Sequence, residues 1–151
     1  MPEQFVFLMG KYEARFPTDR LYARSHMWFQ AEREAYRVGF TAFAVRLLQD
    51  VYFLDWSIEP GTVVEAKQEI GEIESSKAVS TLHAPANGTL LGFNRELMKD
   101  PTPINVDNYG TGWLFDFEPK DATLLGAAEY VQYLEGTWEE TQQQIKGQMH
   151  D

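Results

Sequence analysis

Lys77 is the residue whose type and surroundings best suit a chemical role. It lies in Glu74–Ala78, where only small side chains adjoin it. Two loosely similar ten-residue segments, Gly61–Ile70 and Gly88–Leu97, flank this stretch, with Lys77 almost midway between them. Two related strand–turn units tend to pair about a quasi-twofold axis, which leaves the hairpin between them protruding. The pattern predicts a lysine amine presented at a hairpin tip, as in proteins that carry a cofactor on a swinging arm. An ordinary exposed hairpin lysine is the alternative.

Other polar groups give weaker signals. Glu72 with Glu74, and Glu139 with Glu140, are paired carboxylates of the kind that acid–base enzymes use. Adjacent residues on a helix do not converge, however, and alternate residues on a strand only share a face, so we interpret both pairs as solvated charge. The segment Asn108–Gly112 contains glycine but lacks the lysine of a phosphate-binding loop, and we interpret it as a turn. The sequence therefore does not favour an independent enzyme.

Composition narrows the function classes. The 151 residues fit one domain, and the 44% hydrophobic content is sufficient for a folded core. The net charge of −10 argues against a nucleic-acid partner, because phosphate binding needs clustered Lys and Arg. The chain has no cysteine, and its three histidines match no zinc pattern, so no metal site is expected. The apolar run Phe5–Met9 is too short for a signal sequence or a membrane span, so the cytoplasm is the expected location.

Short strands separated by turn residues dominate the middle of the chain. Pro and Gly interrupt residues 60–103 at short intervals, a spacing typical of a β-sandwich or barrel. No segment alternates a strand with a long helix, which argues against a parallel α/β sheet. The expected elements are a hairpin of Met27–Ala31 with Tyr36–Phe40, a short helix from a Thr41 cap to Leu48, and strands Val51–Trp56 and Trp113–Phe117.

Both ends of the chain are expected to lie outside the main domain. We interpret residues 1–16 as an N-terminal extension, residues 17–135 as the domain and residues 136–151 as a polar C-terminal extension. Apolar residues at helical spacing predict a helix from Ala122 to Leu134, which Gly136 interrupts. A second helix can follow the glycine, with one face made of Trp138, Gln142 and Ile145.

The stretch around the lysine resembles a known attachment site. Glu74–Ala78, followed by Ala84–Gly88, resembles the lipoyl-attachment hairpin of the biotinyl/lipoyl carrier superfamily. A biotin carrier is expected to have methionine on both sides of the lysine, whereas Ser76 and Ala78 stand there, so lipoyl is the better match. The resemblance implies lipoate attached through an amide to Lys77, with Glu74, Ser76 and Ala78 recognised in the hairpin.

Further segments resemble the H protein of the glycine cleavage system, in the order in which that family has them. They are Pro17–Tyr22 with Ser25–Trp28, Gly39–Ala44, Gln49–Val51 and Asn105–Leu114. The resemblance covers about residues 17–135. It implies a mainly β fold, a hybrid barrel-sandwich with a short internal helix and a C-terminal helix. It also implies a non-catalytic carrier whose arm moves bound groups between separate enzymes.

The sequence departs from that family at two positions. In glycine cleavage the loaded arm bears an aminomethyl group, a cation at neutral pH, and a desolvated ammonium needs a counter-charge. The resemblance implies carboxylates at two positions that Met27 and Thr81 occupy here. Neither side chain balances a positive charge, although Glu72 or Glu74 could substitute from elsewhere. We therefore take Met27 and Thr81 as candidate residues of an arm-docking groove.

The two substitutions favour one hypothesis about the cargo. A neutral or sulfur-containing intermediate suits Met27 and Thr81 better than an ammonium. Relatives within the family serve heterodisulfide-reductase-like sulfur oxidation systems, and this sequence resembles them in its altered pocket and C-terminal extension. The implied partners are a lipoate attachment enzyme and enzymes like dihydrolipoyl dehydrogenase and heterodisulfide reductase, with no nucleic acid and no membrane.

Other functions remain open. One alternative is glycine cleavage itself, in which the arm serves the decarboxylase, the aminomethyltransferase and dihydrolipoyl dehydrogenase. Others are a carrier that relays lipoyl groups to other proteins and an unmodified β-sandwich interaction module.

Overall fold

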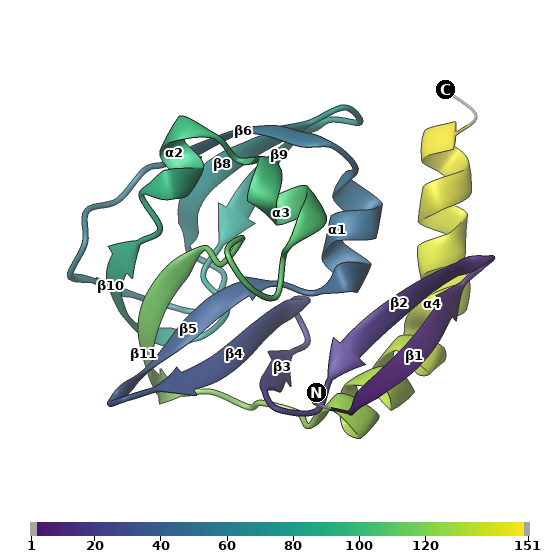
Figure 1. The fold of residues 1–151 in the computed structure, drawn as a ribbon, viewed down its shortest axis with the longest axis horizontal. Helices are drawn as coiled ribbons and strands as arrows, with labels where there is room; N and C mark the ends of the chain where they lie inside the picture. Colours follow the sequence, from purple (N-terminus) through teal and green to yellow (C-terminus); the bar gives the residue numbers. More distant parts are fainter. Residues whose placement is uncertain (1–2, 150–151) are drawn as a thin grey trace.

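Antiparallel β-sheets make up most of the molecule (Figure 1). The structure is a computed structural model that describes residues 3–149, with side chains described through residue 140. The largest sheet has the strand order β3-β4-β5-β11-β10-β7, a second has the order β6-β8-β9, and β1 pairs with β2. The strands are β1 Gln4–Met9, β2 Tyr12–Pro17, β3 Leu21–Ala23, β4 Met27–Glu32, β5 Ala35–Phe40, β6 Val51–Trp56, β7 Thr62–Val64, β8 Glu69–Ser75, β9 Val79–His83, β10 Asn87–Phe93 and β11 Phe115–Asp121.

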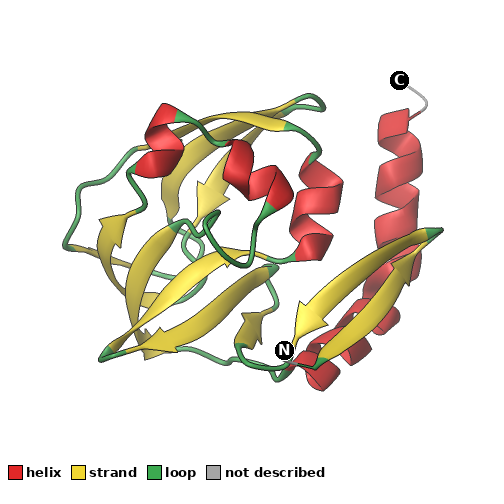
Figure 2. Ribbon diagram, in the orientation of Figure 1, coloured by secondary structure: helices red, strands yellow, loops and turns green. Residues whose placement is uncertain are grey.

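Helices lie beside and between the sheets (Figure 2). They are α1 Ala42–Leu48, α2 Glu96–Lys99, α3 Thr102–Val106 and α4 Ala127–Met149. The short α2 and α3 both contact β6, and the long α4 contacts β1 and β3. The helices therefore close the open sides of the sheets, and the fold agrees with the expected mainly β class.

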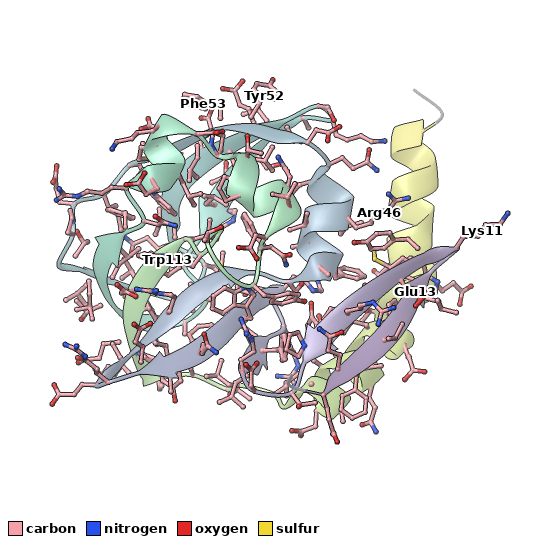
Figure 3. The ribbon with its side chains drawn as sticks, in the orientation of Figure 1. Lys11, Glu13, Arg46, Tyr52, Phe53 and Trp113 are labelled. Carbon is pink, nitrogen blue, oxygen red and sulfur yellow. The ribbon has the colours of Figure 1, made fainter. Side chains whose placement is uncertain are left out.

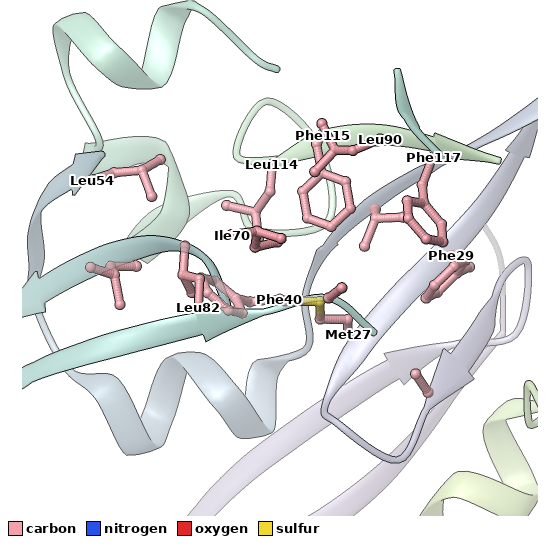
Figure 4. Packing of buried hydrophobic residues seen from close by; sticks show 14 of the residues in the cluster. Met27, Phe29, Phe40, Leu54, Ile70, Leu82, Leu90, Leu114, Phe115 and Phe117 are labelled. Carbon is pink, nitrogen blue, oxygen red and sulfur yellow. The ribbon is translucent and has the colours of Figure 1, made fainter. Parts of the chain in front are cut away.

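A first core fills the space between the two larger sheets. Its members come from both sheets, and Figure 4 shows Phe29, Phe117, Ile70 and Leu82 among the side chains directed into this shared interior. Phe29, Phe117 and Ile70 are fully buried. Alternating apolar residues on the inner faces of two packed sheets are the expected basis of a sandwich core. The hybrid barrel-sandwich prediction is confirmed.

A second core joins the first hairpin, α1 and α4. The inner face of β1–β2 contributes Phe7 and Phe16, and α4 contributes Tyr130. The Phe7 ring meets Trp138 edge-on at a centroid distance of 5.3 Å, and Tyr22 stacks on Tyr130 at 4.9 Å. Residues 4–16, which the sequence predicted only as part of an extension, therefore belong to a hairpin with a buried face.

Two strand pairs are nested around Lys77. β7 pairs antiparallel with β10, with Val63 opposite Thr89, and these two residues are equally distant from Ser76 in the sequence. β8 pairs antiparallel with β9, with Glu74 opposite Val79, so this inner hairpin has nearly the same centre. The two similar segments thus pair with one another, as the repeat predicted, and the chain between them turns at Ser76 and Lys77.

The predicted elements of the first half are confirmed. β4 and β5 form the expected hairpin, and β6 has the expected bounds. Helix α1 begins after Thr41, whose Oγ1 accepts a hydrogen bond of 3.3 Å from the Ala44 N–H. An N-cap side chain of this kind satisfies an otherwise unpaired backbone donor.

The predicted C-terminal elements need correction. α4 is one helix that continues through Gly136, and the predicted start at Ala122 is wrong because Leu125 exchanges two backbone hydrogen bonds with Tyr22. A glycine inside a helix costs only about 1 kcal/mol, and packing of Trp138 against Phe7 compensates. The side chains of Gln142 and Ile145 lie outside the described residues. The last strand begins at Phe115, later than the predicted Trp113.

Gly39 offers a test of the packing against Trp28. A Cβ at Gly39 would lie 2.5 Å from Cζ2 of the fully buried Trp28. We expect Gly39→Ala to lower the free energy of unfolding by about 1–3 kcal/mol, because overpacking forces the indole or the backbone to move. Gly92→Ala is the matched control, since nothing lies within 4 Å of a Cβ there. Urea denaturation measures both variants, and equal stability of the two would contradict the expectation.

Candidate functional site

The turn between β8 and β9 holds Lys77 by its main chain. The Ser75 N–H donates to the Ala78 carbonyl at 3.0 Å, which closes the turn. The Lys77 N–H donates to Ser75 Oγ at 3.3 Å, and Ser75 itself is buried. Serine hydroxyls commonly stabilise turns through such local bonds. The backbone of Lys77 is therefore fixed although its side chain is exposed.

A second segment clamps the same turn from outside. The Ser76 N–H lies 3.2 Å from the Gln49 carbonyl and 3.3 Å from the Asp50 carbonyl, and Ser76 Oγ donates to Gln49 at 3.3 Å. Gln49 and Asp50 both have positive φ, of 55° and 46°. That backbone conformation is uncommon outside glycine, and it lies in the link from α1 to β6 that supplies both carbonyls. The clamp ties the hairpin tip to the end of α1.

The Lys77 side chain extends into solvent from this rigid base. Within residues 3–140, no ion pair or hydrogen bond engages its ammonium group. Glu74 lies opposite Val79 in the strand register, and its carboxylate forms no ion pair with Lys77. Ser76 and Ala78 beside Lys77 are exposed and small. The amine is therefore accessible to an enzyme that approaches the tip.

A groove runs along the side of the hairpin below the tip. It has a volume of about 240 Å³, and its walls come from the segment before β4, from α1 and from β8 and β9. Met27 and Thr81 both line it, together with apolar side chains such as Leu47 and Ile73. The structure thus brings the two predicted groove residues to one cavity. Their role in binding stays a prediction.

Met27 and Thr81 contribute to the groove in different ways. Met27 is 4% exposed and belongs to the first core, so it forms part of the floor. Thr81 is exposed on the edge strand β9, opposite Glu72 on β8. Directly opposed residues of an antiparallel pair lie about 5 Å apart and on the same face of the sheet. Glu72 is therefore a carboxylate near the rim, while no Asp or Glu is among the described residues that line the groove.

His26 links the groove wall to α4. Its Nδ1 lies 2.8 Å from the Tyr130 hydroxyl, which lies 3.0 Å from Thr41 Oγ1. Thr41 Oγ1 already accepts from the Ala44 N–H, so one arrangement satisfies every group: Thr41 donates to Tyr130, and Tyr130 donates to Nδ1. Burial lowers the pKa of His26 to about 4, which keeps the imidazole neutral at pH 7. His26 therefore adds no positive charge to the groove at neutral pH.

Sequence reasoning missed the clamp and the histidine network. The residue type of Gln49 does not signal a positive φ, and that of Asp50 signals it only weakly, since aspartate is enriched in this conformation. Tyr130 was expected only as a helical residue, and its contact with His26 joins positions 104 residues apart. Within residues 3–140, no group of His, Asp and Glu side chains could hold a metal ion. No helix within residues 3–149 is long and apolar enough to span a membrane.

The fold and the site together define a class of protein. A barrel-sandwich with a lysine at the tip of a clamped, protruding hairpin has the architecture of the biotinyl/lipoyl carrier proteins. The sequence profile of the Glycine cleavage H-protein family matches residues 20–137, and the chain belongs to this family.

Individual relatives agree with that assignment. The glycine cleavage system H protein of Mycobacterium leprae (strain TN) is 41% identical over 123 residues, which are 76% of this chain and 92% of the relative. The protein of the same description from Bordetella pertussis is 40% identical over 118 residues, covering 76% and 94%. The crystal structure of a glycine cleavage system H protein from Mycobacterium marinum has a TM-score of 0.70 and 38% identity, with coverage of 78% and 98%. The hairpin β1–β2 precedes the family match.

The neutral His26 predicts a pH dependence of stability. A base whose pKa falls from 6.5 to about 4 on folding stabilises the native state above pH 6.5, and this contribution disappears as the pH falls toward 4. His26→Asn is a suitable reference, because Asn tolerates the positive φ of 70° and does not titrate. Between pH 7.5 and 4.5 we expect the wild type to lose about 2 kcal/mol more unfolding free energy than His26→Asn, from the 1.36 kcal/mol that one pKa unit represents. Parallel urea titrations that show equal losses would contradict this.

Proposed function

We propose that this protein is the lipoyl carrier of a glycine cleavage system, with lipoate attached through an amide to Lys77. The observation that carries the proposal is the exposed Lys77 amine on a clamped turn beside an apolar groove. The similar relatives are described as glycine cleavage system H proteins, which favours this alternative over the sulfur-oxidation hypothesis. The protein would work in the cytoplasm as a non-catalytic subunit.

The residues around Lys77 fit a lipoyl group. Thr81 is four residues from Lys77 along β9, a span of roughly 13 Å at the rise of an extended strand. A lipoylated lysine reaches roughly 14 Å from Cα at ordinary chain dimensions. An arm on Lys77 can therefore extend into solvent or fold along β9 into the groove, whose walls of Met27, Leu47 and Ile73 suit its hydrocarbon chain.

Each part of the site has a separate task in this proposal. When attached, the lipoyl group supplies a disulfide that accepts a carbon group on one sulfur while the other sulfur becomes a thiol. Lys77 supplies the tether, which raises the effective concentration of the cargo at each enzyme in turn. Glu74, Ser76 and Ala78 form the hairpin that the attachment enzyme recognises. Met27 and Thr81 shield the bound cargo from water, and Glu72 at the rim offers a counter-charge for an amine.

A neutral, sulfur-containing cargo is a second candidate. It is favoured by the absence of a carboxylate among the described residues that line the groove. Glu72 lies opposite Thr81 on the central strand β8 and is exposed, so its attraction for an ammonium is screened by water. Enzymes like heterodisulfide reductase would be the partners under this second candidate, and no comparison supports them.

Attachment at Lys77 can be tested by intact mass. Incubation with lipoate, ATP and a lipoate–protein ligase should raise the mass by about 188 Da, that of lipoic acid less one water. We expect Lys77→Arg to abolish the gain, because an arginine is not acylated, and Lys99→Arg to retain it, because Lys99 is an exposed lysine of α2 away from the hairpin. A gain that persists in Lys77→Arg would refute the assignment, and no gain in the wild type would favour an unmodified interaction module.

Loading with glycine distinguishes between the two candidate cargoes. With glycine decarboxylase and glycine labelled with ¹³C at its α-carbon, the lipoylated protein should take up the labelled carbon while the carboxyl carbon leaves as CO2. The rate should be within about tenfold of that of a recognised H protein, since an exposed counter-charge is worth less than about 1 kcal/mol. Mass spectrometry of the intact protein measures the uptake, and unlipoylated protein is the blank. If the recognised H protein is loaded and this chain is not, the glycine cleavage proposal is wrong and the second candidate replaces it.

A further inference from the structure

The outer face of the sheet β6-β8-β9 carries two rows of side chains. The strand register places Phe53, Glu74 and Val79 opposite one another across the three strands. The next row along the strands is Asp55, Glu72 and Thr81. Opposed residues of antiparallel strands share a face, and Leu54 and Ile73 between the rows are buried in the first core. Both rows therefore face away from the core.

A β-bulge places two aromatic residues next to each other on this face. The register between β6 and β8 shifts between Val51 and Phe53, so Tyr52 is the additional residue. A bulge breaks the alternation of a strand, and both Tyr52 and Phe53 are exposed, by 60% and 43%. Figure 3 shows both side chains projecting on the outer side of β6. Val79, which is 59% exposed, lies in the same row two strands away, with the partly exposed Glu74 between it and Phe53. We call Tyr52, Phe53 and Val79 the bulge patch.

The bulge patch lies at the end of the sheet that carries Lys77. Val51, next to Tyr52, is opposite Ser75, and Lys77 is two residues beyond Ser75. Neighbouring strands are about 4.8 Å apart and residues rise about 3.3 Å along a strand, so Tyr52 and Lys77 lie on the order of 10 Å apart at Cα. Val79 is two residues beyond Lys77 on the other side of the turn. A protein that reaches the lysine amine from the outer face of the sheet therefore lies over or beside the bulge patch.

The backbone under the bulge patch is held rigidly. Asn105 of α3 closes the edge of β6, because its Oδ1 accepts from the Val51 N–H at 2.8 Å and its Nδ2 donates to the Val51 carbonyl at 2.9 Å. The adjacent residue, Asp50, belongs to the clamp on Ser76. A surface that is fixed before binding loses little entropy when a partner docks. The bulge patch and the Lys77 turn thus form one preorganised unit.

The charges near the bulge patch indicate the sign of its partner. Asp55, Glu69 and Glu72 are exposed on the three-stranded sheet, and Glu74 is partly exposed between Phe53 and Val79. The three strands contain no lysine or arginine, and Lys77 lies in the turn that joins two of them. The face therefore suits a partner that surrounds an apolar pocket with Lys and Arg. A second copy of this chain is disfavoured, because it would bring two acidic faces together.

We propose that Tyr52, Phe53 and Val79 form the docking surface for the enzyme that attaches lipoate to Lys77. This inference rests on the proposed attachment of lipoate. In that reaction lipoate and ATP first give lipoyl adenylate with release of pyrophosphate. The Lys77 amine then attacks the carbonyl carbon of the adenylate, and AMP leaves as one amine proton is released. The bulge patch contributes binding, and it takes no part in bond making. Aromatic side chains that lie together on a surface are typical anchors of protein interfaces.

Kinetics of lipoate attachment test the bulge patch. With a bacterial lipoate–protein ligase, lipoate and ATP, the double variant Tyr52→Ser/Phe53→Ser should show a KM for the carrier raised at least about tenfold, since covering roughly 60 Å² of aromatic surface is worth that factor. We expect kcat to change less than about twofold, because the Lys77 turn is untouched. The control is Val63→Ser on β7, which removes an apolar side chain of 75% exposure from the other large sheet.

A second measurement tests the carboxylates near the bulge patch. Asp55→Asn should raise the KM by a few fold at low salt and by less at high salt, because screening already weakens the attraction. Asp121→Asn, at the end of β11, is the matched control and should leave the KM unchanged. An effect of Asp55→Asn that does not depend on salt would contradict a partner that surrounds its apolar pocket with Lys and Arg.

The possible failures are distinguishable. If the wild type gains no lipoyl mass at Lys77, the proposed function fails and the docking surface fails with it. If the wild type is modified and the double variant has the same KM as Val63→Ser, the docking surface alone is refuted. Circular dichroism and urea denaturation of the variants verify that they fold. Phe53→Tyr, which retains a ring, should keep most of the affinity that the double variant loses.

Discussion

The nested pairing of strands about Ser76 and Lys77 is the constraint on which the rest of the site depends. β7 with β10, and β8 with β9, turn around almost the same point of the sequence. The outer pair belongs to the large sheet and the inner pair to the three-stranded sheet, so the two pairs join the sheets across the first core. This arrangement forces the intervening turn to the end of the molecule, and the bonds from Ser76 to Gln49 and Asp50 then fix its position.

Much of this arrangement is readable from the sequence because it depends on local signals. The repeat, the turn residues and the small neighbours of Lys77 predict a presented lysine, and the Thr41 cap and the run Val51–Trp56 predict their elements correctly. The features that were missed depend on contacts between distant residues. Gly136 favours a break when α4 is considered alone, and the interface of Trp138 with Phe7 overrides it. The bulge at Tyr52 likewise exists only through its register with β8.

The groove shows how a site can lack acidic side chains although the molecule is strongly acidic. The chain has a net charge of −10, but burial keeps His26 uncharged and Met27 belongs to the core. The carboxylates of the three-stranded sheet lie on its outer face, and among them Glu72 approaches the rim only through its pairing with Thr81. The carboxylate of Glu72 can therefore act on a bound arm at the mouth of the groove. The interior of the groove favours a cargo by its size and its apolar contacts. The identity of the cargo depends on how strongly this exposed carboxylate competes with water.

Attachment of lipoate would itself change the surface that partners meet. Lys77 lies in a turn of the three-stranded sheet, whose strands contain no lysine or arginine, and an amide removes its positive charge. The exposed side of that sheet would then present carboxylates around the bulge patch without a compensating cation. The attachment enzyme must accept the charged amine, whereas later enzymes meet a more acidic tip with an arm that can withdraw along β9. One hairpin could thus present different electrostatic surfaces before and after loading, without any change in the fold.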